Sequence, residues 1–338
     1  MADFHGCGDY HGHLAGSVLS SLPDAPSAIR IPLTITHMFT ASLRFNQLTF
    51  SLAEATQHPQ VLALVHTARF RLIQFGQTTL NLPHAHIRMA VAWHHQKPVA
   101  TVIATTATPM VAWIRCCALD GIHLSDHDMV IRRLTHMLIT TSGIATFYYS
   151  SDHYDHWLAD ILVSVGFTIR GSIVALERPV QRALPSVSAP AVAQLRTLDI
   201  SDIATIQHID QLVFAEKWHK IPFEFHELLR DAHYGVLASH DDGAVGYVVA
   251  AIHDFQTALH IVRIAVHPHW QGRGIAKQLL SNVIAHAHTT GIQRMSLNTQ
   301  ADNHVAQHLY KQFGFLLTGD QYDVFSTLPV TPTPHDIA

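Results

Sequence analysis

A strand–turn–helix stretch in the last third of the sequence constrains the fold most strongly. Residues Leu259–Val266 alternate and are mostly apolar, as expected of a strand buried on both faces. Pro268 ends that strand, and two glycines, Gly272 and Gly274, follow it. From Ile275 to Ala287 the apolar residues recur three and four positions apart, which predicts an amphipathic helix. The sequence therefore predicts a buried strand that enters a helix through a glycine-lined turn.

This turn has the chemistry of an anion-binding site. The first N–H groups of a helix have no partner inside the helix, and the helix dipole places partial positive charge there. A phosphate or pyrophosphate suits such a place, and Arg273 adds a charge at its rim. The glycine and lysine spacing of a nucleotide-triphosphate loop is absent, as are the third glycine and the acidic residue of a dinucleotide-binding turn. The turn by itself leaves a phosphate site and a purely structural tight turn equally open.

Composition and charge favour a globular chain with two domains. The 338 residues are 48% hydrophobic and only 14% charged, and a net charge of -4 gives no basic field for nucleic acid. No apolar run is long enough to span a membrane, and the first residues do not resemble a signal peptide. Three cysteines cannot form a disulfide framework. We therefore expect a cytoplasmic protein without a nucleic-acid or membrane partner.

The second half alternates strands and helices in a readable order, after a linker rich in Pro and Ser. The expected strands are Gln194–Leu198, Tyr234–Ser239, Ala244–Ile252, Leu259–Val266, Arg294–Leu297, Phe315–Leu317 and Asp323–Ser326, and the expected helices are Asp202–Phe214, Ile275–Ala287 and His304–Phe313. This order predicts an α/β (α+β) fold with a mixed, mostly antiparallel central sheet flanked by helices. The expected parts of the chain are a partly disordered extension (1–44), a first domain (45–181), the linker (182–191), a second domain (192–328) and a flexible tail (329–338).

Histidine is unusually frequent, and this weakens any argument for a metal site. The chain has 29 His, so pairs of His at short spacing arise by chance. The N-terminal stretch from His5 to His13 offers His, Cys and Asp ligands, but it is glycine-rich and lacks a flanking pattern. We therefore expect a mobile tail there and no bound metal.

The full run around the turn resembles the acetyl-CoA motif of the GNAT superfamily of N-acetyltransferases. The signature [Gln/Arg]-x-x-Gly-x-[Gly/Ala] is met by Gln271, Gly274 and Ala276. The run from Asn303 to Phe315 resembles the family's closing motif, Asn-x-x-Ala-x-x-Leu-Tyr-x-x-x-Gly-Phe. The two motifs follow in the family's order, and the resemblance covers roughly residues 192–328. The resemblance implies a GNAT fold and transfer of an acetyl group from acetyl-CoA, as co-substrate, to a primary amine of a small molecule or a protein.

The resemblance also implies roles for individual residues. The end of the buried strand would pair with the pantetheine arm, the turn would hold the pyrophosphate, and Asn303 would contact the cofactor. The strand and turn residues concerned are Ile264, Ala265, Val266, Gln271, Gly272, Arg273, Gly274, Ile275 and Ala276. Tyr310 would protonate the departing coenzyme A thiolate, a task for which a phenol is a suitable acid. The alternative for Tyr310 is a core aromatic residue on an amphipathic helix.

The general base is less well defined by the sequence. Many members of the family carry Glu six residues before the end of the acetyl-CoA strand, and His260 stands there in this chain. An imidazole titrates near neutrality and can accept the proton of the amine through water. The N-terminal acetyltransferases of ribosomal proteins instead carry Glu on the next strand, where this chain has Asn298, which cannot accept a proton. His260 is our predicted base, with Glu216 or the backbone and water as alternatives.

The first half resembles a degenerate second GNAT domain. Its Gly166-Phe167 matches the Gly314-Phe315 ending, and aligning the two places Leu162 at the position of Tyr310 and Asp155 at that of Asn303. The acetyl-CoA motif is missing. Asp126 and Asp128 stand where the phosphate would lie, and their negative charge would repel it.

We therefore expect the first half to be a structural or substrate-gating partner, with an independent α+β domain as the alternative. For the whole chain, the alternative function is a non-catalytic acyl-CoA-binding regulatory module.

Overall fold

The computed structural model describes residues 42–74, 80, 82–151, 156–181, 192–241, 243–253 and 257–328. The histidine-rich N-terminal stretch, the linker 182–191, Asp155 and the tail 329–338 therefore lie outside the described residues. Within the described ranges, no helix combines the length and apolar character that crossing a membrane requires.

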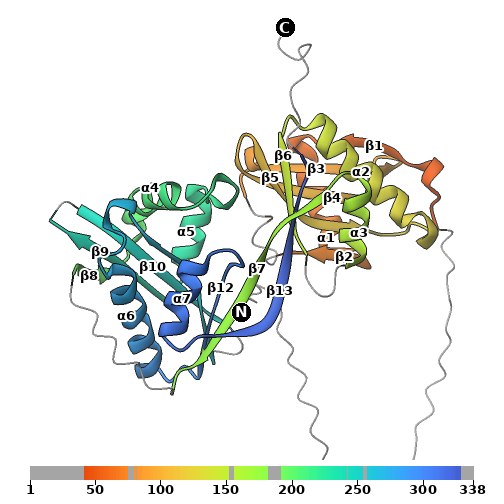
Figure 1. Cartoon of the computed structure of the whole chain (residues 1–338). Helices are drawn as coiled ribbons and strands as arrows, with labels where there is room; N and C mark the ends of the chain where they lie inside the picture. Colours follow the sequence, from red (N-terminus) through yellow and green to blue (C-terminus); the bar gives the residue numbers. More distant parts are fainter. Residues whose placement is uncertain are drawn as a thin grey trace, which may run out of the picture.

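Two α/β halves lie side by side and are joined through one continuous sheet (Figure 1). The first half contains β1 (Thr49–Leu52), α1 (His58–Thr67), β2 (Phe70–Ile73), β3 (Ile87–His94), β4 (Lys97–Thr108), β5 (Val111–Leu119), α2 (His127–Thr141), β6 (Thr146–Ser150), α3 (His156–Ser164) and β7 (Thr168–Pro179). The second half contains β8 (Gln194–Thr197), α4 (Ile203–Val213), α5 (Pro222–Arg230), β9 (Tyr234–His240), β10 (Gly243–His253), β11 (Ala258–Val266), α6 (Ile275–Thr289), β12 (Arg294–Gln300), α7 (His304–Gln312) and β13 (Leu316–Ser326). The predicted fold class, a mixed and mostly antiparallel sheet flanked by helices, is confirmed.

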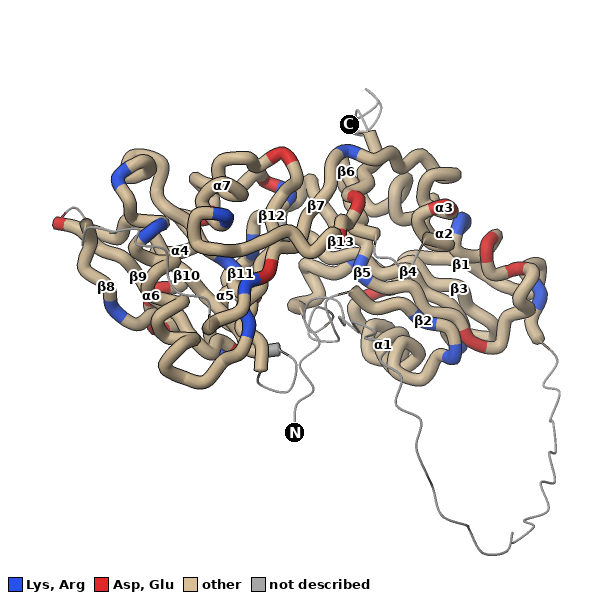
Figure 2. The backbone as a smooth tube through the Cα atoms, turned by 60° about the horizontal axis from the view of Figure 1, so that its bottom comes forward, with Lys and Arg blue, Asp and Glu red and all other residues tan. Residues whose placement is uncertain are grey.

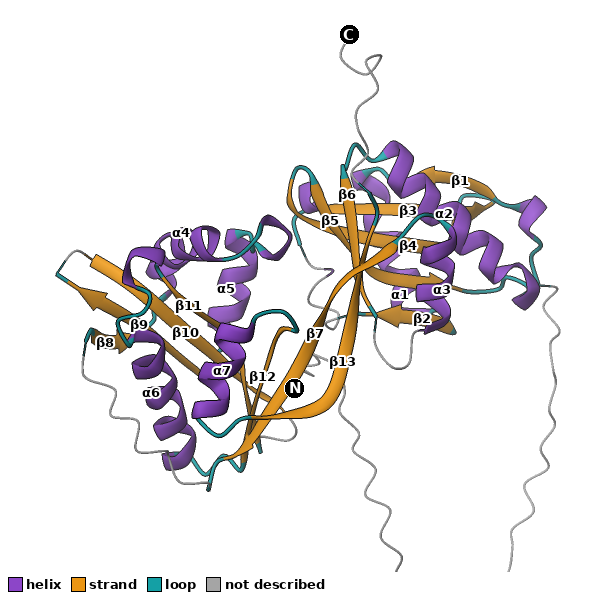
Figure 3. Ribbon diagram, viewed as in Figure 1, coloured by secondary structure: helices purple, strands orange, loops and turns teal. Residues whose placement is uncertain are grey.

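Helices cover both faces of the sheet in each half (Figure 3). In the second half, α6 and α7 pack on one face, where Leu279, Leu280 and Val283 of α6 are completely buried. The other face carries α4 and α5, with Ile206 and Phe225 buried against β10. These positions recur at helical spacing, so the apolar stripe that predicts each helix is also the stripe that the helix buries.

Each half completes the sheet of the other half with its last strand. β7 leaves the first half and pairs antiparallel with β12 from Ile173 to Pro179, while β13 returns and pairs with β6 from Val324 to Ser326. Between these contacts, β7 and β13 pair with each other and cross from one half to the other (Figure 1).

This exchange corrects one prediction from the sequence. Phe315–Leu317 and Asp323–Ser326 are not two separate strands, because one continuous strand, β13, runs through both segments. A hairpin at this point would be needed only if the second half supplied both of its closing strands, and β7 supplies one of them. The register of β13 against β7 shifts between Leu317 and Gln321, so the polar stretch that suggests a turn is an irregularity within the strand.

A buried histidine of the first half, His58, makes stability depend on pH. His58 is 4% exposed, and its Nδ1 lies 2.7 Å from Nδ1 of His84, so one ring donates and the other accepts. Burial, the neighbouring His84 and Arg88 lower the pKa of His58 below its ordinary value of 6.5, despite a hydrogen bond to the backbone at Ala53. The folded protein therefore binds fewer protons than the unfolded chain. The stability that depends on neutral His58 is complete above about pH 6.5 and is lost as the pH falls below it.

We therefore expect the free energy of unfolding to decrease between pH 7.5 and 5.5, and His58→Phe to reduce that decrease. Urea unfolding at the two pH values measures both effects. The exposed His136→Gln is the matched control. An equal decrease in the wild type and in His58→Phe would show that this pair does not cause the pH dependence.

Candidate active site

The strands β11 and β12 part in the middle of the second half, and this opening is the candidate site. They pair in parallel only from Ala258 to Ile261 on β11, opposite Arg294–Leu297 on β12. From Arg263 to Val266, β11 still pairs with β10 on its other side. In the described structure no strand pairs with the β12-facing edge of that segment. An open strand edge presents free N–H and C=O groups to an extended ligand that carries amides.

The glycine turn lies at the end of this open edge. Gly272 and Gly274 have φ angles of 75° and 92°, a left-handed conformation that suits glycine. Gly274 is the N-cap of α6 and provides no side-chain cap, so the first N–H groups of that helix are available to an anion. The side-chain amide of Gln271 donates to the carbonyl of Val266 at 3.0 Å and ties the turn to β11. The predicted strand end and the predicted phosphate turn therefore form one continuous surface.

Arg273 is held at the rim of the turn by an aromatic ring. Its guanidinium carbon lies 4.6 Å from the centroid of Trp270, within range of a cation–π interaction. The charge therefore remains beside the helix terminus, as expected of a group that faces a phosphate.

Tyr310 lies on the face of the sheet that α6 and α7 cover. Its side chain is 7% exposed and packs with Leu297 and Phe315. Burial raises the pKa of Tyr310 to about 12, so the phenol stays protonated at neutral pH. Its hydroxyl has no hydrogen-bond partner among the described residues. A protonated donor without a partner is available to an anion that forms nearby.

Asn303 begins α7 and acts as its cap. Its side-chain oxygen accepts a hydrogen bond from the backbone N–H of Ala306 at 3.1 Å. The amide nitrogen of Asn303 remains available, so the cap does not conflict with the predicted contact to the cofactor.

His260 lies on the opposite face of the sheet from Tyr310. Its neighbours Leu259 and Ile261 both pack toward α6, so the strand alternation points His260 toward the face of α4 and α5. His260 is 7% exposed, and its Nδ1 lies 2.9 Å from the Ser296 hydroxyl on β12. The predicted acid and base thus lie on opposite faces of the sheet, close to the point where β11 and β12 separate.

The sequence did not reveal a buried ion pair on the same face as His260. Arg263 of β11 donates two hydrogen bonds, each 2.7 Å long, to the carboxylate of Asp210 on α4. Tyr247 donates to the same carboxylate at 2.5 Å, and Arg263 also donates to the carbonyl of Trp218 at 2.7 Å. The carboxylate of Asp210 raises the pKa of Arg263, although burial opposes this. The available signal was Arg263 itself, a charged residue inside a mostly apolar strand.

This ion pair fixes the segment between α4 and α5. The segment runs from 214 to 221 and includes the short 3-10 helix Glu216–Trp218. The guanidinium of Arg263 stacks 3.6 Å from the ring centroid of Phe214 and also bonds Trp218, so it holds the segment at two places. The segment is therefore anchored to the strand that carries the open edge.

In the first half, the corresponding opening is filled by the chain itself. β5 and β6 pair in parallel only from Val111 to Trp113 on β5, and they then part as β11 and β12 do. Here β2 pairs with β5 along Cys116–Leu119 and takes the edge that is open in the second half. Gln74 follows β2 and bonds the backbone of both Arg115 and Ser150, which bridges the remaining space.

The N-terminus of α2, beside that opening, already has a carboxylate of the protein next to it. The carboxylate of Asp126, at the start of α2, accepts from the backbone N–H of Phe45 at 2.8 Å and pairs with Arg44 at 3.1 Å. Leu162, which aligns with Tyr310, is fully buried. Among the described residues there is no group of three or more His, Cys, Asp or Glu arranged to hold a metal ion.

Comparison with known proteins agrees with this geometry. Residues 200–315 match the model of the acetyltransferase (GNAT) family. A Bacillus subtilis (strain 168) protein named as a ribosomal protein bS18-alanine N-acetyltransferase is 32% identical over 124 residues, which are 36% of this chain and 80% of that protein. The chain belongs to the acetyltransferase (GNAT) family. The family's acyl-CoA-dependent N-acyltransferase activity is therefore the kind of activity that this GNAT chain has.

Three further proteins are similar to this chain in sequence or in fold. The L-amino acid N-acyltransferase MnaT of Escherichia coli (strain K12) is 34% identical over 99 residues, 28% of this chain and 56% of that protein. A tandem GNAT protein from the clavulanic acid biosynthesis pathway superimposes with a TM-score of 0.56 at 14% identity, covering 85% of this chain and 99% of that one. A GNAT protein from Sphaerobacter thermophilus gives a TM-score of 0.52 at 13% identity, with the same coverage. The two halves of the described structure therefore have a tandem GNAT fold.

One prediction follows from the contrast between the two halves of this GNAT protein. We expect one molecule of coenzyme A to bind per chain, because β2 occupies the opening of the first half. Isothermal titration calorimetry measures this ratio. Replacing Gly272 and Gly274 together by Val forces side chains into a left-handed turn and is expected to abolish the binding. Binding of a second equivalent of coenzyme A would contradict the prediction. Binding that persists in this double variant would contradict it as well.

Proposed function

We propose that the chain transfers an acetyl group from acetyl-CoA to a primary amine by direct attack of the amine on the thioester. The observation that carries this proposal is the open edge of β11, which leads directly into the uncapped N-terminus of α6. The edge suits the amide-bearing pantetheine arm, and the helix terminus suits the pyrophosphate.

The residues around the opening would each bind a different part of the cofactor. The backbone of Ile264, Ala265 and Val266 would pair with the pantetheine arm and orient the thioester. The turn residues from Gln271 to Ala276 would hold the pyrophosphate. Asn303, at the start of α7, would add a side-chain amide contact to the cofactor.

Tyr310 is proposed as the general acid. Its phenol remains protonated at neutral pH and has no other hydrogen-bond partner in the described structure, so it would donate to the thiolate as that group leaves. The acid lies on the face of α6 and α7, on the opposite side of the sheet from the proposed base.

His260 is the proposed base. The amine must lose a proton before or during the attack, and an imidazole near the acceptor face can take that proton through water. The Ser296 hydroxyl, 2.9 Å from Nδ1, would hold the ring in one orientation. The glutamate that ribosomal-protein acetyltransferases carry on the next strand is replaced here by Asn298, which supports an acceptor other than a ribosomal protein terminus.

The test is release of free thiol from acetyl-CoA across a panel of primary amines, including amino acids, polyamines and peptides. We expect the rate to rise with the concentration of at least one amine. A chain that binds coenzyme A but releases thiol at the same rate with and without every amine would instead be a non-catalytic acyl-CoA-binding regulatory module.

A further inference from the structure

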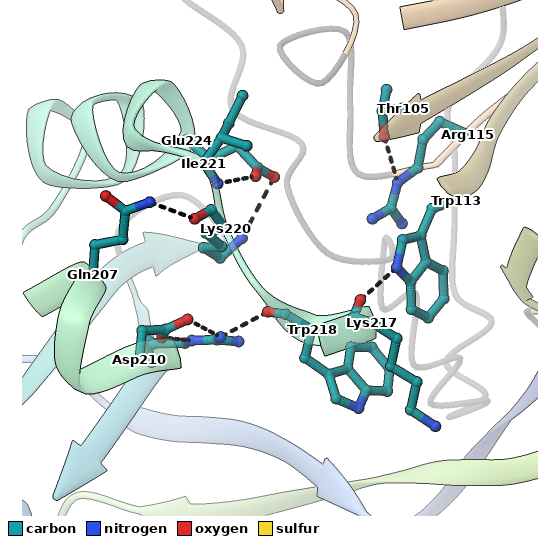
Figure 4. Close-up of polar contacts among 11 residues, drawn as sticks. Thr105, Trp113, Arg115, Gln207, Asp210, Lys217, Trp218, Lys220, Ile221 and Glu224 are labelled. Carbon is teal, nitrogen blue, oxygen red and sulfur yellow. Dashed lines mark hydrogen bonds and ion pairs between the residues drawn. The ribbon is translucent and has the colours of Figure 1, made fainter. Parts of the chain in front are cut away.

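The segment between α4 and α5 of the second half is docked on the first half (Figure 4). The indole N–H of Trp113 on β5 donates to the carbonyl of Lys217 at 2.7 Å, and the rings of Trp113 and Trp218 lie 4.8 Å apart. Thr108 donates to the carboxylate of Glu216 at 2.6 Å. The inner side of this segment is bonded to Arg263, so the segment connects the first half directly to the open strand β11.

A pocket lies where this segment meets the first half. Its volume is about 390 Å³, and its walls come from β6, β7, the end of β13 and the docked segment. Its lining residues include the cationic Arg170 and Lys217 and four residues that carry a hydroxyl, namely Thr146, Tyr148, Ser326 and Thr327. The hydroxyl of Thr327 already accepts a hydrogen bond from the backbone N–H of Phe147 at 3.0 Å. Neither half can form this pocket alone, because β7 and β13 cross between the halves at this place.

The two cations of the pocket are not neutralised by the protein. In the described residues, neither Arg170 nor Lys217 forms an ion pair with a carboxylate. The ammonium of Lys217 lies 5.5 Å from the ring centroid of Tyr148 and 5.6 Å from that of Trp218, so aromatic rings position it without cancelling its charge.

The acidic side chains nearby are already engaged. Glu216 accepts from Thr108, and burial together with its negative charge raises the pKa of Tyr148. Glu224 accepts from the backbone N–H of Ile221 at 2.9 Å and pairs with Lys220 at 3.9 Å. Glu216 thus bonds the first half and Glu224 bonds its own segment, and the charged residues that line the pocket itself are the cations Arg170 and Lys217.

We infer that this junction pocket binds an anionic group of the acceptor, a carboxylate or a phosphate, so that the substrate is an acidic amine. The inference rests on the proposed function, because it names the substrate class of the same site. Lys217 precedes Trp218, whose carbonyl accepts a hydrogen bond from Arg263 on β11, so the docked segment links the pocket to the strand that carries the open edge. Two cationic side chains that line one cavity can give an anion charge-assisted hydrogen bonds.

The experiment compares charged and neutral partners of the same amine in the thiol-release assay. β-Alanine is paired with β-alaninamide to test a carboxylate, and phosphoethanolamine is paired with ethanolamine to test a phosphate. We expect kcat/KM to be about 10-fold or more higher for the charged member of one pair. Lys217→Met and Arg170→Met are expected to bring the ratio of kcat/KM between the charged and the neutral member of that pair close to one.

Two further variants separate loss of charge from loss of structure. Lys217→Arg keeps the positive charge and is expected to restore the preference for the acidic amine. Lys220→Met removes a cation from the same segment outside the pocket and is expected to keep the wild-type ratio. Equal kcat/KM values within both pairs, together with no effect of Lys217→Met, would overturn the inference while leaving the proposed function intact.

A different outcome would contradict the proposed function. If no amine accelerates thiol release, that function fails, and the pocket is then tested by binding alone. Acetate and inorganic phosphate are titrated into the full chain while tryptophan fluorescence is recorded, since Trp113 and Trp218 flank Lys217. Saturable quenching that Lys217→Met removes supports the anion site, and its absence in the wild type overturns it.

Discussion

Tyr310→Phe is expected to lower kcat for amine-dependent release of coenzyme A about 100-fold or more, because the thiolate loses its proton donor. The KM for acetyl-CoA should change little, since the ring that packs against Leu297 and Phe315 is retained. The hydroxyl has no protein partner in the described structure, so its removal should also leave the unfolding midpoint nearly unchanged. Steady-state kinetics and a thermal melt measure these quantities.

Tyr234→Phe is the matched control for this experiment. Its hydroxyl donates to the side chain of Asn282 on α6, away from the opening between β11 and β12. An unchanged kcat in Tyr310→Phe would assign Tyr310 to the hydrophobic core and would require another proton donor for the thiolate.

Asp210→Ala is expected to destabilise the fold by about 3–5 kcal/mol, the usual cost of leaving one charge of a buried pair without its partner. Asp210 is 1% exposed in its side chain and Arg263 is 11% exposed, so water cannot solvate the remaining guanidinium well. Tyr247 would lose the acceptor of its hydroxyl as well. Urea unfolding monitored by circular dichroism measures the free energy of unfolding.

Asp210→Ala should also weaken the binding of the amine acceptor more than the binding of acetyl-CoA. Arg263 anchors the carbonyl of Trp218, so a displaced guanidinium would release the segment that borders the acceptor side. We expect a larger increase of KM for the amine than for acetyl-CoA. The double variant Asp210→Leu, Arg263→Met removes both charges and should recover part of the stability, but not the KM for the amine. A double variant as unstable as Asp210→Ala would show that the ion pair is not the source of the loss.

The sequence predicted the proposed cofactor side of the site more completely than the proposed acceptor side. The turn around Gly272 and Gly274 is encoded locally, because a left-handed backbone and a helix start are properties of adjacent residues. The proposed acceptor side is bordered instead by the segment that leads into α5 (Pro222–Arg230), a short helix that was not predicted, and that segment is held by the ion pair between Arg263 and Asp210. Those two residues stand 53 positions apart, and no local pattern indicates that they meet.

The roles of the charged residues could not be predicted from the sequence either. They are scattered along the backbone of both halves rather than gathered in one acidic or basic run (Figure 2). The acidic residues between 216 and 231 could be interpreted either as an attraction for a cationic amine or as a solvated helix face. The structure shows these side chains bonded within their own segment or to the first half, while Lys217 and Arg170 remain without a carboxylate partner in the described residues.

By itself, the sequence determined the glycine turn, the buried strand before it and the helix after it, since strand alternation, helix period and glycine geometry all act over a few residues. It also indicated that the first half lacks the acetyl-CoA motif. Only the tertiary structure decided how the first half closes its own opening and how it contacts the second half. β2 closes the opening there, β7 and β13 exchange between the sheets, and Trp113 holds the segment at Lys217 across 104 positions. The physical reason is that strand pairing and junction contacts join residues far apart in the chain, and their partners are chosen by which edges and side chains remain free once each half has folded.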